Sequence, residues 1–276
     1  MKVIKQSGER VNFEPEKLRS SLFKSGASVA VVDLILQKVS DEVYDGISTK
    51  NIYKKAFGLL KKGANSFAAR YNVKTAIQML GPAGFHFEKY IARLFESEKF
   101  ETKINMTLQG KCVSHEVDIL VKKNDRIEMV ECKFHGSQAA VSDVKIPMYI
   151  LSRYNDLNVK EHEIFSHKDV ISSCLIVTNN RFTTDAIDFA NCSGINLLSW
   201  DYPENNNLET KNLRDCLYPV TCLTTLASAE KDKLLNAGVI LARELLEEPE
   251  VLNELNISSK RKINVLREVE ELCKCF

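Results

Sequence analysis

Hydrophobic and polar residues alternate most clearly between residues 116 and 134. Residues 117–121 and 127–134 are short, apolar and rich in β-branched side chains, and the five residues between them are polar. This pattern predicts two strands joined by a turn, which together form a β-hairpin. Side chains alternate across a strand, so Glu131 and Lys133 share one face. Asp118 faces opposite to its apolar neighbours, and the two strands can bring carboxylates and an ammonium group to one end of a sheet.

The chain continues with alternating helical and strand patterns. A helix pattern runs through residues 144–154, a short apolar strand spans 174–178, and a second helix starts at 183–186 and ends at Gly194. Residues 195–200 read as a last strand. This order predicts a mixed sheet with helices on both faces, an α/β core.

The N-terminal and C-terminal segments read mainly as helices. Residues 3–5 and 11–13 flank a turn and predict a small hairpin. Four helices follow: the first opens at residues 14–16, the third begins at residue 48 or 49, and the fourth covers about residues 66–79 before Gly81 and Pro82. Pro82 suits the first turn of the next helix. Leucines and valines beyond residue 219 are spaced as in a small helical bundle, with turns at 234–239 and 255–258 that resemble helix–hairpin–helix turns.

Four segments are therefore expected: 1–82, 83–202, a Pro-, Asn- and acid-rich linker at 203–218, and 219–276. The C-terminal segment could clamp a DNA backbone through the amide groups of its turns. It carries more acidic than basic residues, however, so an interaction or dimer module is an equal interpretation.

Net charge is distributed unevenly along the chain. The 276 residues carry a formal net charge of +1, with 38 Lys and Arg against 37 Asp and Glu. Basic residues outnumber acidic ones in residues 1–82, and the reverse holds in the remainder. A basic N-terminal segment predicts an anionic partner such as a nucleotide or a nucleic acid. We expect a cytoplasmic protein without a membrane segment, because no long apolar run and no secretory signal are present.

The convergence of Asp118, Glu131 and Lys133 has a chemical use. Mg²⁺ prefers hard oxygen ligands and usually takes one or two protein carboxylates with several waters. A bound metal activates water and offsets charge on a phosphate, and a neighbouring lysine can hold the attacking water. Glu88, at the edge of a predicted apolar helix face, needs a partner for its charge and could join this site. The alternatives are a cross-strand salt bridge for the hairpin residues and an exposed surface position for Glu88.

Residues around this motif resemble the PD-(D/E)XK nuclease superfamily, in its Mrr-type restriction endonuclease branch. The resemblance covers about residues 82–200 and rests on residues 84–92, 115–118, 130–135 and 177–183. It implies that Glu88, Asp118 and Glu131 bind Mg²⁺ or Mn²⁺ and that these residues act with Lys133 in cleaving DNA. Some relatives carry Gln-x-x-x-Tyr on the next helix. Here the matching register has Lys145 in place of the glutamine and Pro147 inside the motif, which departs from that pattern.

The N-terminal segment resembles the ATP-cone, a regulatory domain of ribonucleotide reductases and of their transcriptional repressor. The resemblance rests on residues 3–8, 13–18, 47–53 and 68–71. It implies ATP or dATP binding, with phosphate contacts from Lys5, Arg10 and Lys17 and with Thr49 nearby. The first turn carries one basic residue fewer than the family usually shows. The chain has no Gly-rich P-loop lysine motif, so nucleotide hydrolysis is not implied.

Taken together, the sequence predicts a metal-dependent DNA endonuclease in restriction or genome defence, with ATP or dATP as an effector. Cutting both strands would favour a homodimer. The alternative is a nucleotide-responsive DNA-binding or assembly protein whose nuclease fold is inactive.

Overall fold

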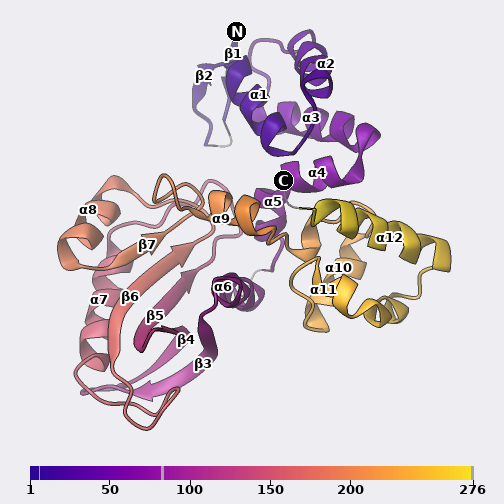
Figure 1. Cartoon of the computed structure of the whole chain (residues 1–276). Helices are drawn as coiled ribbons and strands as arrows, with labels where there is room; N and C mark the ends of the chain where they lie inside the picture. The colour runs from indigo at the N-terminus through magenta and orange to yellow at the C-terminus, as the bar shows by residue number, and fades with distance from the viewer. Residues whose placement is uncertain (6, 82–83, 275–276) are drawn as a thin grey trace. The chain divides into compact units, whose positions relative to one another are not determined.

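The structure is a computed structural model that describes residues 1–5, 7–81 and 84–274 (Figure 1). Internal contacts divide the chain into two compact units, one of residues 1–77 with 216–276 and one of residues 78–215. The predicted boundary at residues 82 and 83, and the helix start at Pro82, lie outside the described residues. None of the helices described in this structure is long and apolar enough to cross a membrane.

The described part of the second unit is built on a five-stranded sheet with the order β3-β4-β5-β6-β7. Its strands are β3 (Glu101–Gln109), β4 (Ser114–Lys123), β5 (Arg126–Lys133), β6 (Ile171–Thr178) and β7 (Asn196–Leu198). Strands β3, β4 and β5 pair antiparallel, whereas β5, β6 and β7 pair parallel. The predicted hairpin and the mixed sheet are therefore confirmed.

Helices cover both faces of this sheet (Figure 1). Helices α7 (Lys145–Leu157) and α8 (Thr184–Ser193) lie on one face, where Ile150 and Ala186 join Met129 and Ile176 in a buried apolar cluster. Helix α6 (Phe85–Ser97) packs against β3, β4 and β5 with Phe87, Tyr90, Ile91 and Leu94 buried. Helix α8 has the predicted ends: the Thr183 side chain caps its first turn, and Gly194 follows with a φ of 73°.

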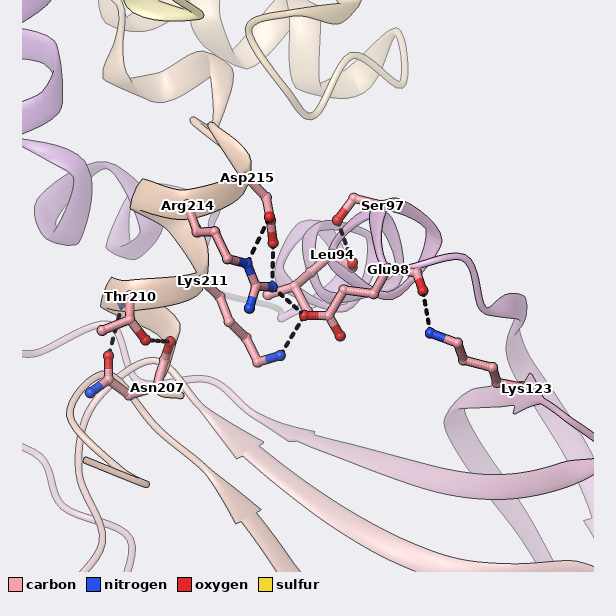
Figure 2. Close-up of polar contacts among 9 residues, drawn as sticks. All are labelled: Leu94, Ser97, Glu98, Lys123, Asn207, Thr210, Lys211, Arg214 and Asp215. Atoms are coloured by element: carbon pink, nitrogen blue, oxygen red, sulfur yellow. Dashed lines mark hydrogen bonds and ion pairs between the residues drawn. The ribbon is translucent and has the colours of Figure 1, made fainter. Parts of the chain in front are cut away.

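Two elements of this unit differ from the sequence prediction. Strand β3 had not been predicted, although Thr102, Ile104, Met106 and Leu108 recur at every second position. Residues 203–218, predicted as a linker, contain helix α9 (Leu208–Asp215). This helix is attached to α6 by side-chain contacts. Asn212 donates to the Tyr90 hydroxyl. Lys211 and Arg214 bind Glu98, as Figure 2 shows.

The first unit begins with the predicted hairpin, β1 (Lys2–Ile4) and β2 (Arg10–Asn12). Helices α1 (Pro15–Lys24), α2 (Val29–Ser40) and α3 (Thr49–Gly63) follow. Ser48, one of the two residues predicted to begin this helix, caps α3 by accepting from the Asn51 N–H at 3.2 Å. The predicted fourth helix is two helices, α4 (Asn65–Tyr71) and α5 (Val73–Gln78), which are separated at Asn72.

The same unit contains the C-terminal helices. They are the 3₁₀ helices η1 (Val220–Cys222) and η2 (Pro249–Leu255) and the α-helices α10 (Ser228–Asn236), α11 (Glu244–Glu247) and α12 (Ser259–Leu272). Buried Arg70 of α4 donates to the carbonyl oxygens of Glu271 and Leu272 at the end of α12. Ser66 of α4 donates to the Glu271 carboxylate at 3.3 Å. Free carbonyl groups at a helix end need such donors, so α4 and α12 are joined by polar contacts as well as by packing.

Candidate active site

Three of the predicted site residues lie on the paired strands β4 and β5. Asp118 is half-buried on β4, and Glu131 and Lys133 lie at the carboxyl end of β5. The backbone N–H of Cys132 donates to Oδ2 of Asp118 at 2.7 Å. Since Cys132 lies between Glu131 and Lys133 in the chain, this bond fixes Asp118 relative to both. The structure therefore brings together the Asp…Glu-x-Lys residues of the sequence motif.

Glu88 approaches the same place from α6. Gly84 precedes this helix with a φ of 80°, a conformation that favours glycine. A Cβ atom on Gly84 would lie 3.5 Å from Oε1 of Glu88 and 3.8 Å from Cβ of Phe134, just beyond β5. The start of α6 thus lies close to the end of the strand that carries Glu131 and Lys133.

Arg153 of α7 contacts both strands of the site. Its Nη1 donates to both carboxylate oxygens of Glu131, at 2.8 and 2.9 Å, and its Nη2 donates to the backbone carbonyl of Glu116. The Arg153 side chain is 12% exposed and that of Glu131 is 17% exposed, so both are largely removed from solvent. Arg153 is not among the site residues predicted from the sequence. No motif marks it, because its role depends on how α7 packs against β5.

The carboxylates of the site repel one another. Burial, followed by the charges of Asp118 and Glu116, raises the pKa of Glu88 to about 7. Burial and the charge of Asp118 raise the pKa of Glu131 to about 7, although Arg153 and Lys133 act in the opposite direction. Burial also raises the pKa of Asp118, against the hydrogen bond from Cys132 and the charge of Arg153. Like charges that share a desolvated site are costly, so this site favours a cation.

A metal would have to fit this donor set. Among residues 1–5, 7–81 and 84–274, no three His, Cys, Asp or Glu side chains come together as a group that could hold a metal ion. Glu88 influences Asp118 electrostatically, but the predicted three-carboxylate set is not assembled in the structure. Asp118 and Glu131 remain a pair of hard oxygen donors on adjacent strands. Such a pair fits Mg²⁺, which keeps several of its waters.

The chain leaving β5 is fixed to the neighbouring strand β6. The N–H of His135 donates to Oδ1 of Asn179 at 2.8 Å, and Nδ2 of Asn179 donates back to the His135 carbonyl at 2.8 Å. Nε2 of His135 and Oγ of Ser142 are 2.9 Å apart. These bonds hold the segment that follows Lys133. The helix register with Lys145 and Pro147 forms the start of α7, where Tyr149 is 64% exposed.

Two of the predicted nucleotide-binding residues, Lys5 and Thr49, lie close together beyond the end of β1. Ile4 forms a parallel bridge to Ser48, and its N–H donates to the Ile47 carbonyl at 2.9 Å. This pairing places Lys5, the next residue, beside Thr49 at the first turn of α3. Helix N-termini bind anions through their free N–H groups.

The other two predicted residues lie on neighbouring elements, Arg10 on β2 and Lys17 on α1. Lys5 and Lys17 each form an exposed ion pair, with Glu9 and Glu14, at 2.8 Å. Exposed pairs of this kind contribute little to stability, so a phosphate could replace either acid.

Comparisons with known proteins match all three parts of the chain. Residues 1–75 match the ATP cone domain, residues 82–202 match a restriction endonuclease family (Mrr_cat), and residues 218–273 match the AF1548-like C-terminal family. The first two matches confirm the resemblances stated from the sequence.

Individual relatives were also found. An uncharacterized protein of Archaeoglobus fulgidus is 33% identical over 183 residues, which are 66% of this chain and 99% of that protein. The crystal structure of AF1548, a protein of unknown function, is 31% identical with a TM-score of 0.57, covering 68% of this chain and 97% of that one. A crystal structure of VC1899 from Vibrio cholerae gives 11% identity and a TM-score of 0.30 over 56% of this chain and 34% of that one, too low to inform the fold.

The three family matches cover the cone, the sheet with its candidate site and the C-terminal helices. The chain therefore belongs to the family of the A. fulgidus protein, and it combines an ATP cone, a restriction endonuclease domain and an AF1548-like C-terminal region.

Proposed function

We propose that this chain is a divalent-metal-dependent endonuclease that hydrolyses DNA phosphodiester bonds. The observation that carries the proposal is the placement of Asp118 beside Glu131 and Lys133 on paired strands, fixed by the bond from the Cys132 N–H. Two carboxylates and one ammonium group at a strand end supply both metal ligands and a positive charge. The restriction endonuclease match over residues 82–202 supports this assignment.

Each residue has a proposed role. Asp118 and Glu131 would hold Mg²⁺ or Mn²⁺. When bound, the cation would lower the pKa of a water molecule and offset charge on the scissile phosphate. Lys133, exposed at the end of β5, would hold the attacking water and stabilise the added negative charge. Glu88 would act from α6 by orienting waters of the site rather than as a direct ligand.

ATP or dATP would act as an effector through the cone. The phosphates would be contacted by Lys5, Arg10 and Lys17. Thr49 lies nearby at the first turn of α3, whose free N–H groups can bind an anion. Regulation requires that the nucleotide bind two states of the protein with unequal affinity. The combination with a restriction endonuclease domain supports a role in restriction or genome defence, and cleavage of both strands would favour a homodimer.

The test is plasmid cleavage by the purified full chain with Mg²⁺ or EDTA, with and without ATP or dATP. Methylated and unmethylated plasmids are both tested, so that a requirement for methylation, or for its absence, does not conceal cleavage. Lys133→Ala should abolish nicking and linearisation. Lys168→Ala, an exposed lysine of the same unit, should cleave like the wild type.

The second candidate function is a nucleotide-responsive DNA-binding or assembly protein without nuclease activity. The ion pair between Arg153 and Glu131 favours it, since it occupies a carboxylate that the metal would need. Binding of either plasmid without cleavage under all of these conditions would move the assignment to this function.

A further inference from the structure

We propose that Arg153 is the resident cation of the candidate site and competes with the divalent metal for Glu131. This inference rests on the proposed metal site, but it concerns ion binding rather than cleavage. It makes Arg153 a positioning residue that sets how much metal the site requires.

The geometry of the Arg153–Glu131 pair carries the inference. Nη1 lies 2.8 Å from Oε1 and 2.9 Å from Oε2 of Glu131, so one guanidinium nitrogen is shared by both oxygens. A guanidinium nitrogen between the two carboxylate oxygens occupies the position from which a metal ion would bind both of them. A metal ion that binds both oxygens of Glu131 from this side must displace Arg153.

A second contact holds Arg153 in place. Its Nη2 donates to the backbone carbonyl of Glu116 on β4, two residues before Asp118. The guanidinium therefore connects α7 to both strands of the site. The Tyr149 ring, one helical turn earlier on α7, has its centroid 5.9 Å from Cζ of Arg153. Contacts on several sides make this a defined position rather than a chance surface pairing.

The charges around the site explain why a cation is needed. Glu131 and Asp118 lie on paired strands, the Glu116 carboxylate lies on the same strand as Asp118, and Glu88 approaches from α6. Lys133 is exposed, whereas Arg153 is largely buried against Glu131. Without Arg153, the desolvated Glu131 carboxylate would lose its ion pair, which is costly. A divalent ion would relieve the same cost, so guanidinium and metal serve the same electrostatic purpose.

The prediction has two parts. In EDTA, Arg153→Gln should lower the thermal midpoint, because the carboxylates lose their counter-charge. The same variant should also bind Mg²⁺ more tightly than the wild type, because both oxygens of Glu131 are available to the ion. We expect the half-saturating Mg²⁺ concentration to fall by about tenfold, the factor that corresponds to about 1.4 kcal/mol.

The experiment measures Mg²⁺ binding by calorimetry and thermal midpoints across a Mg²⁺ titration, using the full chain. Arg126→Gln is the matched control, since Arg126 is exposed at the opposite end of the same strand, β5. The single variant Glu131→Gln and the double variant Arg153→Gln/Glu131→Gln complete a cycle in EDTA. If charge compensation is the role of Arg153, the midpoint lost in Arg153→Gln should be largely recovered in the double variant.

The outcomes separate this inference from the proposed function. Tighter Mg²⁺ binding by Arg153→Gln supports the inference even if neither protein cuts DNA. Cleavage by the wild type with an unchanged or weaker Mg²⁺ affinity in Arg153→Gln overturns the inference and leaves the nuclease assignment standing. If neither protein binds Mg²⁺, the competition is overturned together with the metal site.

Discussion

The backbone N–H of Cys132 donates to Oδ2 of Asp118 at 2.7 Å and joins the two strands that carry the candidate site. Strand pairing alone sets the register of β4 and β5 within the hairpin, with Ile119 opposite Val130. The side-chain bond adds a fixed orientation for the carboxylate. One oxygen of Asp118 thus has a protein donor, and the other is the one that could bind a cation.

Asp118→Asn should separate the structural from the chemical role of this residue. The amide oxygen can still accept from the Cys132 N–H, so the fold should be kept. Removal of a desolvated negative charge should leave the thermal midpoint in EDTA unchanged or higher. Loss of the metal ligand should abolish the Mg²⁺-dependent rise in the midpoint and lower plasmid cleavage by roughly a thousandfold, as expected when several kcal/mol of charge stabilisation are lost.

Glu116→Gln is the control for this prediction. Glu116 lies on the same face of β4 two residues earlier, and its side chain is exposed. Thermal melts and cleavage assays of the two variants should therefore differ sharply. Equal loss of cleavage in both would mean that Asp118 acts only through the general charge of the strand.

Alternation along the chain was sufficient to predict the hairpin and the convergence of its charged residues. Asp118, Glu131 and Lys133 are separated by few residues, so local strand geometry determines their relative positions. The α/β order beyond them was also predictable, since Thr183 and Gly194 mark the ends of α8 with side chains that suit a helix start and a helix end.

Contacts between distant elements could not be predicted in the same way. Arg153 lies 22 residues from Glu131, and only the packing of α7 on the sheet brings them together. Helix α9 did carry a local signal that was missed: Oδ1 of Asn207 accepts from the Thr210 N–H at 2.9 Å, as a helix cap does. The surrounding Pro and Asn residues favoured the linker interpretation. The buried position of Lys211 depends on Glu98, more than a hundred residues away.

Lys5→Ala tests the proposed phosphate site of the cone. Lys5 follows Ile4, which bridges to Ser48 beside the first turn of α3, so its ammonium group can reach an anion held there. A charge-assisted contact contributes about 1.5–3 kcal/mol, so ATP or dATP affinity should fall by roughly ten- to a hundredfold in calorimetry. Lys62→Ala, in the last turn of α3, is the control and should bind normally. Equal affinity of all three proteins would remove Lys5 from the site.

Asp156→Asn should weaken the fold in a pH-dependent way. The Asp156 carboxylate accepts from the Cys112 N–H at 2.7 Å and the Val113 N–H at 3.2 Å, and lies 2.8 Å from Nε2 of His115. Burial alone would raise the pKa of Asp156, but the hydrogen bonds from His115, Val113 and Cys112 hold it well below its usual range. These contacts fix the turn between β3 and β4 to α7.

The sign of the effect follows from this lowered pKa. A carboxyl group with a lower pKa in the folded chain stabilises the fold above its unfolded pKa, near 3.8, and the stabilisation is lost as the pH falls through the folded value. In urea denaturation, the wild type should be more stable than Asp156→Asn at about pH 6, and the difference should shrink below about pH 4. A difference that grows on acidification would contradict this assignment.

Glu98→Gln tests whether α9 is an integral part of the unit formed by residues 78–215. Oε1 of Glu98 lies 2.5 Å from Nζ of Lys211 and 2.7 Å from Nη2 of Arg214, and its backbone carbonyl accepts from Nζ of Lys123 at 2.7 Å (Figure 2). The Lys211 side chain is only 9% exposed. Removing its carboxylate partner leaves a buried ammonium group without compensation, so the free energy of unfolding should fall by about 3 kcal/mol in urea denaturation.

Asp215→Asn is the matched control, because it removes a carboxylate from the same cluster. Asp215 contacts Arg214, whose side chain is 55% exposed, whereas Lys211 contacts Glu98 (Figure 2). An ion pair of this exposure contributes little, so the loss should stay within about 1 kcal/mol. A large loss for Glu98→Gln beside a small one for Asp215→Asn would establish that the segment predicted as a linker is fastened to α6 through Lys211. Two small losses would mean that α9 can detach without cost, and residues 203–218 would then act as the linker that the sequence suggested.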